Sequence, residues 1–468
     1  MMSIKDLQLK NPWWINNDYV IPEKDWPKRD IFSHLEKNLN HPLMLNIIGL
    51  RRVGKSTIVK QLIAGLLSCG IKSTNLFYYL FDYSSQIKTT EFLNNVLAVY
   101  LSEVRQKTIN NLDETLYIFL DEIQYIEDWQ SIVKKYYDLS NKKIKFILTG
   151  SQSILLKGKS KESLAGRIFD YYLPPLSFTE FLKINKIGFG NLVKFDLFDL
   201  PKTYFGLSGY NLTYGKKVYD ISKEYIINGQ FPEIRTLNSD ENKSEYILES
   251  VLGKILEDCI KIYKIEKKDE FKLVAYQLLN NISSTFELKN IAREIGISSL
   301  TIEKYLGYLK ESFVFEILFK YHKSLIERGR ILKKVYTTCI NFNCAFNHYK
   351  ESHIDEVPDV FGKIIENLIY NILNQKYPRP NISFWRNGGK EIDFIVLEDK
   401  HLTDKNILPI EVKITKYIDN KDLKIITEYI QSKKIGYGIV ITKNELAKKQ
   451  IYDRTLYFIP YYLMLFLT

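Results

Sequence analysis

One nine-residue stretch, GLRRVGKST at 49–57, restricts the fold of this chain more strongly than its other features. It overlaps the end of an apolar run, LMLNIIGL at 43–50, and opens a helical pattern, STIVKQLIAGLLSC. The spacing G-x-x-x-x-G-K-[ST] between a buried strand and a helix is typical of a loop whose backbone N–H groups surround phosphates. The sequence therefore predicts a nucleotide-binding α/β domain.

The residue types in this loop suit nucleotide phosphates. Gly49 and Gly54 let the backbone approach closely, and the Lys55 ammonium would contact the β- and γ-phosphates. The Ser56 hydroxyl would bind Mg²⁺. We thus expect ATP and Mg²⁺ as cofactors. The remaining candidate nucleotide-binding residues of the loop are Arg51, Arg52 and Thr57.

A second apolar run, TLYIFLDE at 115–122, ends in two acids. Asp121 would hold the Mg²⁺ shell, and Glu122 would orient or deprotonate the attacking water. Paired acids at a strand end can also be solvated charges. The loop at 49–57 favours the catalytic interpretation.

The next apolar run, KIKFILTG at 143–150, brings further polar groups to a strand end. Thr149 and Ser151 are placed to sense the γ-phosphate. Arg167, in the dipeptide GR, is a candidate finger that would reach the phosphates of its own or a neighbouring subunit. The alternative for Arg167 is a surface salt bridge.

The chain divides by pattern into four expected parts. Apolar strands alternate with helices over 1–175, which predicts a doubly wound α/β core. Residues 176–265 read as a helical lid, with an irregular aromatic-rich insertion at 188–215. Residues 266–348 and 349–468 form the third and fourth parts.

The third part has the pattern of a winged helix. Helices are expected at 271–282, 287–296 and 298–312, with a turn at Gly296 and a wing hairpin between 311 and 339. Helix–turn–helix units with Gly in the turn bind DNA, and they also serve as protein-contact scaffolds. Both interpretations stay open.

The fourth part carries a second set of charged residues. Glu411 and Lys413 lie two apart in LPIEVKITK, so an extended strand places them on one face. Alone they would be read as an exposed ion pair. The order Glu366 on a helix, Asp393 on a strand and E-x-K on the next strand resembles the PD-(D/E)xK nuclease core.

That resemblance implies a role for each residue. Asp393 and Glu411 would hold Mg²⁺ or Mn²⁺ through oxygen ligands. Lys413 would position water or stabilise the charged phosphate, and Glu366 would bind a second metal or a metal-bound water.

The composition indicates which partners and which cellular compartment to expect. The formal net charge of +11 favours a polyanionic partner, DNA first, although a lysine-rich proteome alone produces basic proteins. Four cysteines do not form a disulfide framework, which indicates a reducing compartment. No apolar run approaches the length of a membrane span, and the N-terminus lacks a signal-peptide core. We expect a cytoplasmic protein without membrane contact.

Several stretches together resemble the archaeal-type AAA+ ATPases that carry a winged helix and a C-terminal nuclease-like domain. In such proteins a Gly-x-x-Pro element, here ending at Pro232, lies near the nucleotide base. The resemblance covers most of the chain and is looser over 183–217. The matching stretches are GLRRVGKST, IFLDEIQYIEDW, LTGSQS, ESLAGRIFDYYLPPLSFTEF, NPWW and NGQFPEI.

The expected function is an Mg²⁺-dependent ATPase that acts on DNA and is coupled to a metal-dependent nuclease domain. The alternative is a nucleotide switch in which ATP changes conformation or homo-oligomeric state. In that case the C-terminal domain only binds DNA or a protein.

Overall fold

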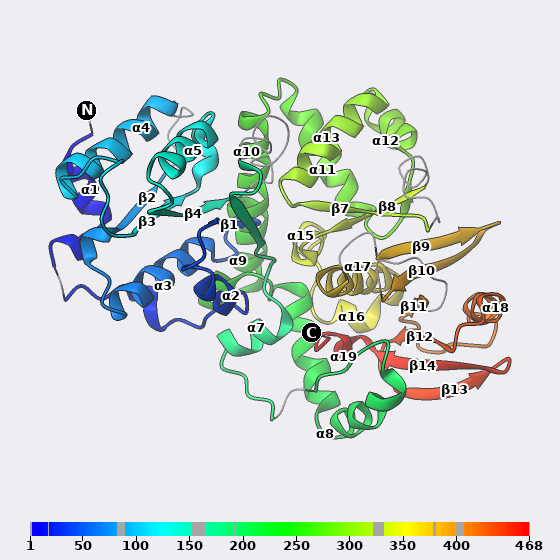
Figure 1. Cartoon of the computed structure of the whole chain (residues 1–468). Helices are drawn as coiled ribbons and strands as arrows, with labels where there is room; N and C mark the ends of the chain where they lie inside the picture. The colour runs from blue at the N-terminus through cyan, green and yellow to red at the C-terminus, as the bar shows by residue number, and fades with distance from the viewer. Residues whose placement is uncertain are drawn as a thin grey trace. The chain divides into compact units, whose positions relative to one another are not determined.

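The structure, a computed structural model, describes residues 2–16, 18–81, 89–151, 164–190, 193–321, 332–377, 381–398 and 407–467. The chain forms two compact units. The first contains Met1–Pro174 and Glu311–Phe313, and the second contains Pro175–Lys310 and Val314–Thr468. Figure 1 labels their helices and strands.

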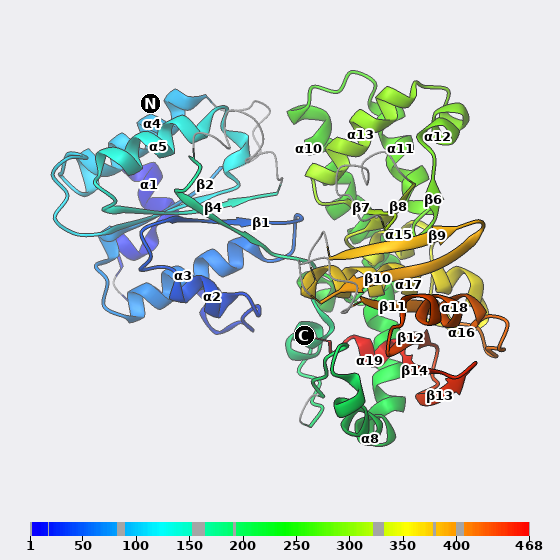
Figure 2. The same ribbon diagram turned by 45° about the vertical axis from the view of Figure 1, so that its right-hand side comes forward.

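The first unit is built on a five-stranded parallel sheet in the order β2-β3-β4-β1-β5. Figure 2 shows α4 (Thr90–Val99) and α5 (Trp129–Leu139) on one face, and α2 (Phe32–Lys37) and α3 (Lys55–Ser68) on the other. The predicted α/β class is confirmed. The strands are β1 (Met44–Ile48), β2 (Leu76–Leu80), β3 (Leu116–Asp121), β4 (Ile144–Gly150) and β5 (Ile168–Tyr172).

The N-terminal NPWW stretch covers the edge strand β2. The Asn11 carboxamide accepts from Tyr78 N at 2.7 Å and donates to Tyr78 O at 3.0 Å, so it substitutes for a neighbouring strand. The indoles of Trp13 and Trp14 donate to Leu76 O at 3.1 and 2.9 Å. An edge that would otherwise present free backbone groups is thereby paired. Helix α1 (Ile4–Lys10) leads into this segment.

The second unit begins with helices. The largest, α8, runs from Leu200 to Ile227, so the expectation of an irregular insertion over 188–215 is wrong from Leu200 onward. Gly206, Gly209 and Gly215 are weak helix formers, but tertiary packing overrides that local preference. The other helical segments before residue 265 are α7 (Phe178–Ile184), η7 (Pro232–Thr236), α9 (Asp240–Glu245), η8 (Tyr246–Gly253) and α10 (Lys254–Ile262).

A module of three helices and three short strands follows. Its antiparallel sheet has the order β6-β8-β7. The three predicted helices are confirmed, and Gly296 ends the second one with a left-handed φ of 80°. The tip of the predicted wing, 322–331, lies outside the described residues. The elements are α11 (Lys268–Asn280), β6 (Thr285–Phe286), α12 (Leu288–Ile295), α13 (Ser299–Glu311), β7 (Phe315–Phe319) and β8 (Lys333–Thr337).

The C-terminal part is a six-stranded mixed sheet in the order β13-β14-β12-β11-β10-β9. Strands β9, β10 and β11 pair antiparallel, whereas β11, β12 and β14 pair parallel. The strands are β9 (Ile382–Asn387), β10 (Lys390–Leu397), β11 (Ile407–Lys413), β12 (Tyr437–Thr442), β13 (Ala447–Ile451) and β14 (Arg454–Pro460). The helices are α15 (Ile340–Phe346), α16 (His353–Glu356), α17 (Pro358–Lys376), α18 (Lys424–Lys433) and α19 (Tyr461–Met464).

One hydrophobic core crosses the expected boundaries inside the second unit. Leu207 and Val218 of α8 belong to the same buried cluster as Ile365 of α17 and Tyr461 and Leu463 of α19. The Ser222 and Tyr461 hydroxyls lie 3.1 Å apart. The predicted lid therefore shares its packing with the C-terminal part.

None of the helices among the described residues is both long and apolar enough to cross a membrane.

Candidate functional site

The loop between β1 and α3 has the backbone that its glycines suggest. Gly54 immediately precedes α3 with φ of +99°. A Cβ on Gly49 would lie 2.3 Å from the Leu173 carbonyl oxygen, so a larger residue does not fit there. The loop is thus held close to the residue that follows β5.

Lys55 is buried, and its ammonium contacts its own loop. Nζ donates to Leu50 O at 2.9 Å, to Gly49 O at 3.3 Å and to Ser151 Oγ at 3.0 Å. It also lies 3.5 Å from Glu122 Oε1. The predicted residues Lys55, Glu122 and Ser151 are therefore brought together. In this arrangement the Lys55 ammonium contacts two carbonyl oxygens of its own loop.

Asp121 ends β3 as a fully buried carboxyl group. Its Oδ1 accepts from the Thr149 hydroxyl, and its Oδ2 accepts from Tyr78 OH at 2.9 Å. Burial and the neighbouring Glu122 charge raise its pKa, while hydrogen bonds from Thr149, Ser56 and Tyr78 oppose that rise. Ser56 and Asp121 thus form one polar group at the helix start.

Glu122 adopts a left-handed backbone, φ 55°, which turns its side chain toward Lys55. Its N–H donates to Thr149 Oγ1 at 2.9 Å, and its Oε2 accepts from Ser151 Oγ at 2.8 Å and from Gln124 Nε2. Burial would raise the pKa of Glu122, but the Lys55 ammonium and these hydrogen bonds lower it. The carboxylate form of a potential base is stabilised.

The remaining loop residues lie around this group. Arg51 Nη1 is 3.5 Å from Tyr125 OH. Arg52 is exposed, with a left-handed φ of 64°. Thr57 lies half-buried in the first turn of α3.

The structure does not bring Arg167 to the loop of its own chain. Met44 N, at the start of β1, donates to Arg167 O at 2.8 Å, whereas the loop follows the other end of β1. About 16 Å of strand separates the two ends. The Arg167 guanidinium instead pairs with Asp138, Nε to Oδ1 at 3.0 Å. A finger role within one chain is not supported by this position.

Sequence reasoning missed Arg29, which is buried beside the loop. Its Nη1 donates to Val53 O, and its Nη2 donates to Pro174 O at 2.8 Å. A lone arginine in PKRD carries no signal for this contact, because its partners lie far along the sequence. Tyr78 on β2 was missed for the same reason.

Pro232 begins η7 in the second unit. It lines a small pocket together with Phe181, Gly229 and Arg235. Its place near a nucleotide base remains a prediction.

The second predicted constellation also comes together. Val412 N donates to Asp393 Oδ2 at 2.9 Å, which ties β10 to β11. Lys413 Nζ lies 2.9 Å from Glu411 Oε1. Glu366 reaches the same open pocket, of ≈ 430 Å³, from α17. The four residues therefore line one pocket.

A residue that the sequence analysis passed over lies in the middle of this group. Lys334 of β8 is 2% exposed, and its Nζ lies 2.9 Å from Glu366 Oε1, 2.7 Å from Glu391 Oε1 and 3.3 Å from Asp393 Oδ1. Tyr336 OH donates to Glu366 Oε1 at 2.7 Å. The sequence carries little signal for this contact beyond the alternation of side chains along β8, because the partners of Lys334 lie 32 or more residues away.

The electrostatics of the pocket follow from burial and crowding of acids. Burial and the Asp393 charge raise the pKa of Glu366 to about 7, although Lys334 and Tyr336 oppose the rise. The same two causes raise the pKa of Glu411 to about 8 against the opposing Lys413. Burial would lower the pKa of Lys334, but its three carboxylates raise it.

As they are arranged, these carboxylates do not fit a divalent metal. Among the described residues, no group of three or more His, Cys, Asp or Glu side chains is placed to hold a metal ion. The oxygen atoms that would be metal ligands instead contact the Lys334 ammonium.

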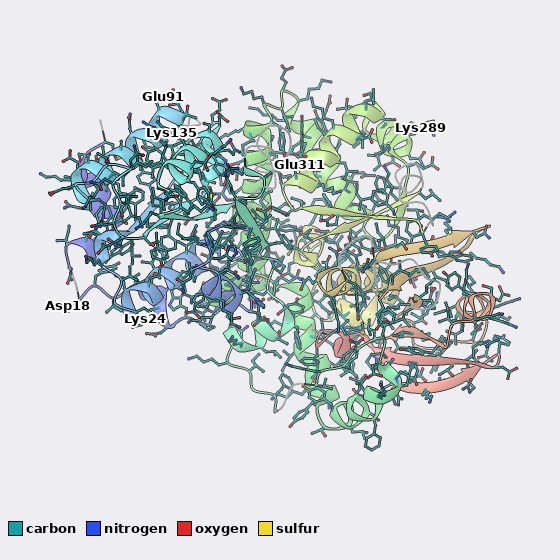
Figure 3. All side chains as sticks on the ribbon, viewed as in Figure 1. Asp18, Lys24, Glu91, Lys135, Lys289 and Glu311 are labelled. Carbon is teal, nitrogen blue, oxygen red and sulfur yellow. The ribbon has the colours of Figure 1, made fainter. Side chains whose placement is uncertain are left out.

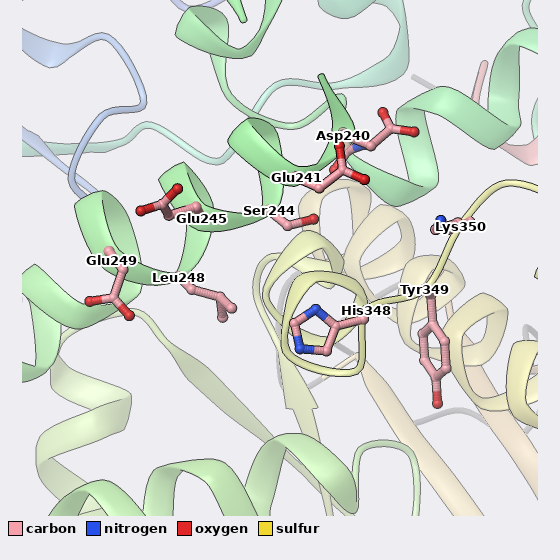
Figure 4. A pocket seen from close by; sticks show the side chains of 10 residues that line it. Asp240, Glu241, Ser244, Glu245, Leu248, Glu249, His348, Tyr349 and Lys350 are labelled. Atoms are coloured by element: carbon pink, nitrogen blue, oxygen red, sulfur yellow. The ribbon is translucent and has the colours of Figure 1, made fainter. Parts of the chain in front are cut away.

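Another pocket, of ≈ 360 Å³, contains neither constellation. Figure 4 shows acidic side chains of α9 and η8 along it, with His348 and Lys350 from the segment after α15. Its labelled acids are Asp240, Glu241, Glu245 and Glu249.

Three families match parts of the chain. Residues 41–182 match a family described as an AAA domain. Residues 219–338 and 361–464 match two domains of unknown function, DUF8612 and DUF4143. Together with the loop geometry, the first match supports an AAA+ ATPase domain, a class of NTPases. The other two families carry no functional description.

Relatives match over most of the length. An uncharacterized protein of Methanocaldococcus jannaschii is 26% identical in an alignment of 404 residues that covers 81% of this chain and 81% of its own. An uncharacterized protein of Haemophilus influenzae is 26% identical over 356 residues, 75% of this chain and 78% of its own.

Solved structures show weaker likeness. Cdc6p of Pyrobaculum aerophilum has a TM-score of 0.30 and 13% identity, over 72% of this chain and 96% of that chain. The RuvB Holliday junction branch migration motor of Thermotoga maritima has a TM-score of 0.25 and 15% identity, over 62% and 89%. Scores this low establish no common fold, so the fold class rests on the sheet itself.

Proposed function

We propose that this chain is an Mg²⁺-dependent ATPase that acts on DNA. The observation that carries the proposal is the group of buried Lys55, Asp121 and Ser151 and half-buried Glu122 at the ends of β1, β3 and β4. Phosphate oxygens would replace the loop carbonyls around Lys55, and Glu122 would take the proton of the attacking water.

Mg²⁺ fits the first site. Ser56 and Asp121 offer the oxygen ligands that this ion prefers, and Asp121 is already held by three hydroxyl groups. When bound, the ion would neutralise charge on the phosphates.

Replacing Lys55 with alanine tests the ATPase proposal. We expect Lys55→Ala to abolish ATP hydrolysis and Lys72→Ala to leave it unchanged, since Lys72 is an exposed partner of Glu114 in the same unit. Wild-type turnover in Lys55→Ala contradicts the proposal.

A DNA contact by the module from α11 to β8 is the second part of the proposal. The order of its three helices and three short antiparallel strands supports a winged-helix assignment. Exposed cations lie on its second and third helices, at Lys289, Arg293 and Lys304, and Figure 3 shows the Lys289 side chain at the surface. The net charge of +11 favours the same partner.

A further part of the proposal is that the pocket of Glu366, Asp393, Glu411 and Lys413 cleaves phosphodiester bonds. This role requires the Lys334 ammonium to leave the oxygens that a metal would bind. Asp393→Asn and Lys413→Ala should each abolish metal-dependent cutting without changing ATP hydrolysis. If the wild type nicks no single-stranded, double-stranded or branched DNA with Mg²⁺ or Mn²⁺, this part is wrong.

The alternative is a nucleotide switch whose C-terminal part only binds DNA or a protein. The Lys334 ammonium among the acids favours it, because it already occupies carboxylate oxygens that a metal would need. This alternative predicts slow hydrolysis and a change of oligomeric state with ATP, visible by size-exclusion chromatography.

A further inference from the structure

Two side chains of strand β8 contact the acids that line this pocket. Lys334 and Tyr336 are two residues apart, so they share the face of β8 that is turned toward Glu366. The preceding residue, Lys333, is partly exposed, and its ammonium lies 5.9 Å from the centre of the Phe319 ring. Only one of two adjacent lysines is therefore committed to the pocket.

The Lys334 ammonium is held by carboxylates from two other elements. Glu366 comes from α17, and Glu391 and Asp393 come from β10. Replacing a buried charge cluster by apolar residues is often neutral or stabilising, so stability alone is a weak reason for burying a lysine here. We therefore look for the role of the buried Lys334 charge in the chemistry of the pocket.

The oxygens that Lys334 occupies are those that a divalent ion would need. Glu366 Oε1 and Asp393 Oδ1 both contact the ammonium. Glu411 Oε2 is buried yet has no hydrogen-bond partner among the residues that the structure describes, so one acceptor oxygen is not used. An ammonium and a divalent cation at the same oxygens repel each other strongly in a desolvated site.

We propose that Lys334 is a built-in cation that keeps the acidic pocket free of metal, so that Mg²⁺ or Mn²⁺ binds only when the Lys334 ammonium leaves these carboxylate oxygens. This regulation rests on the proposed nuclease function of the pocket. Strand β8 belongs to the module proposed to contact DNA, where it pairs with β7 over five residues and with β6 over two. Lys334 therefore joins that module to the acids of the pocket.

The test is Mn²⁺ binding by the full-length chain without nucleotide, followed by electron paramagnetic resonance of the free ion. We expect Lys334→Gln to bind Mn²⁺ at least tenfold more tightly than the wild type. Lys333→Gln is the matched control and should behave like the wild type. Adding Asp393→Asn to Lys334→Gln should abolish the additional Mn²⁺ binding. This double variant distinguishes Mn²⁺ bound in the acidic pocket from Mn²⁺ bound by Ser56 and Asp121.

Equal or weaker Mn²⁺ binding by Lys334→Gln overturns the proposal. If this variant is unfolded without metal, refolding with Mn²⁺ should restore its circular dichroism spectrum, and failure to do so also overturns the proposal. Cleavage of DNA is measured separately. If Lys334→Gln binds Mn²⁺ more tightly but no DNA is cleaved, the role of Lys334 is supported and the nuclease function is rejected. If DNA is cleaved but Mn²⁺ binding is unchanged, the nuclease function is supported and the role of Lys334 is rejected.

Discussion

At the scale of single residues, both constellations depend on a buried lysine that faces acids. Lys55 pairs with Glu122 and its own loop, and Lys334 pairs with three carboxylates. The motif predicted the first lysine because its partners are set by the loop itself. The second was not predictable, because its contacts depend on the packing of β8 against α17 and β10.

Gly49 gives a residue-scale prediction. Gly49→Ala should lower the stability of the first unit by roughly 1–3 kcal/mol and weaken ATP binding, because its Cβ would lie 2.3 Å from Leu173 O. Gly65→Ala is the matched control within α3, where the nearest atom is 3.9 Å away, and it should be neutral or slightly stabilising. Thermal unfolding and nucleotide titration measure both, and equal behaviour of the two variants contradicts the geometry.

Glu411 gives a prediction about pH. Its pKa of about 8 in the folded chain exceeds the ordinary value, so the folded state retains a proton that the unfolded state releases. The contribution of Glu411 to the free energy of unfolding is fully present below the pKa that this group has in the unfolded chain. It is lost as the pH rises through about 8. Asp393 and Lys413 face it.

Raising the pH from about 5.5 to about 7 should therefore reduce the unfolding free energy of the second unit by about 2 kcal/mol through Glu411 alone. Glu411→Gln should remove that share of the slope. Urea unfolding of both chains in metal-free buffer measures it, and identical slopes would show that the raised pKa is incorrect.

At the scale of elements, local patterns predicted most helices and strands but not those decided by packing. Apolar residues form continuous runs in the five parallel strands and recur periodically in the three helices of the middle module. The sequence alone therefore predicts these elements. Helix α8 contains several glycines and was misread, because its helical state depends on burial against α19. Strand β13, AKKQI, was missed because its charges gave no apolar signal.

Asn11 gives an element-scale prediction about the edge of the sheet. Asn11→Ala should destabilise the first unit by about 1–3 kcal/mol, because it leaves Tyr78 N and Tyr78 O without their partners. Asn16→Ala, at an exposed position of the same segment, should have little effect. Hydrogen exchange at Tyr78 N would report the loss directly, and unchanged protection contradicts the capping role.

At the scale of the whole molecule, the chain joins an AAA+-like unit to a larger unit whose matching families have no assigned function. The sequence predicted the change of pattern after Pro174 and Pro175. It could not predict that the lid region and the C-terminal sheet share one core, because that depends on contacts more than 200 residues apart.

Arg167 gives a prediction about assembly. Since it lies at the far end of β1 from the loop, we propose that any contact with phosphates is made to a neighbouring copy of the chain. Turnover per chain should then rise with protein concentration, and Arg167→Ala should lower turnover with nucleotide binding retained. A concentration-independent rate that is unaffected by Arg167→Ala contradicts a finger role and leaves the pair with Asp138 as its function.

The most direct test of the central claim is a single-turnover measurement of ATP bound to the wild type and to Glu122→Gln. This comparison asks whether the Lys55, Asp121 and Glu122 group hydrolyses ATP or only binds it. The wild type should convert bound ATP to ADP, whereas Glu122→Gln should bind ATP with similar affinity and react about 100-fold or more slowly. Hydrolysis at the same rate in both chains would contradict the account.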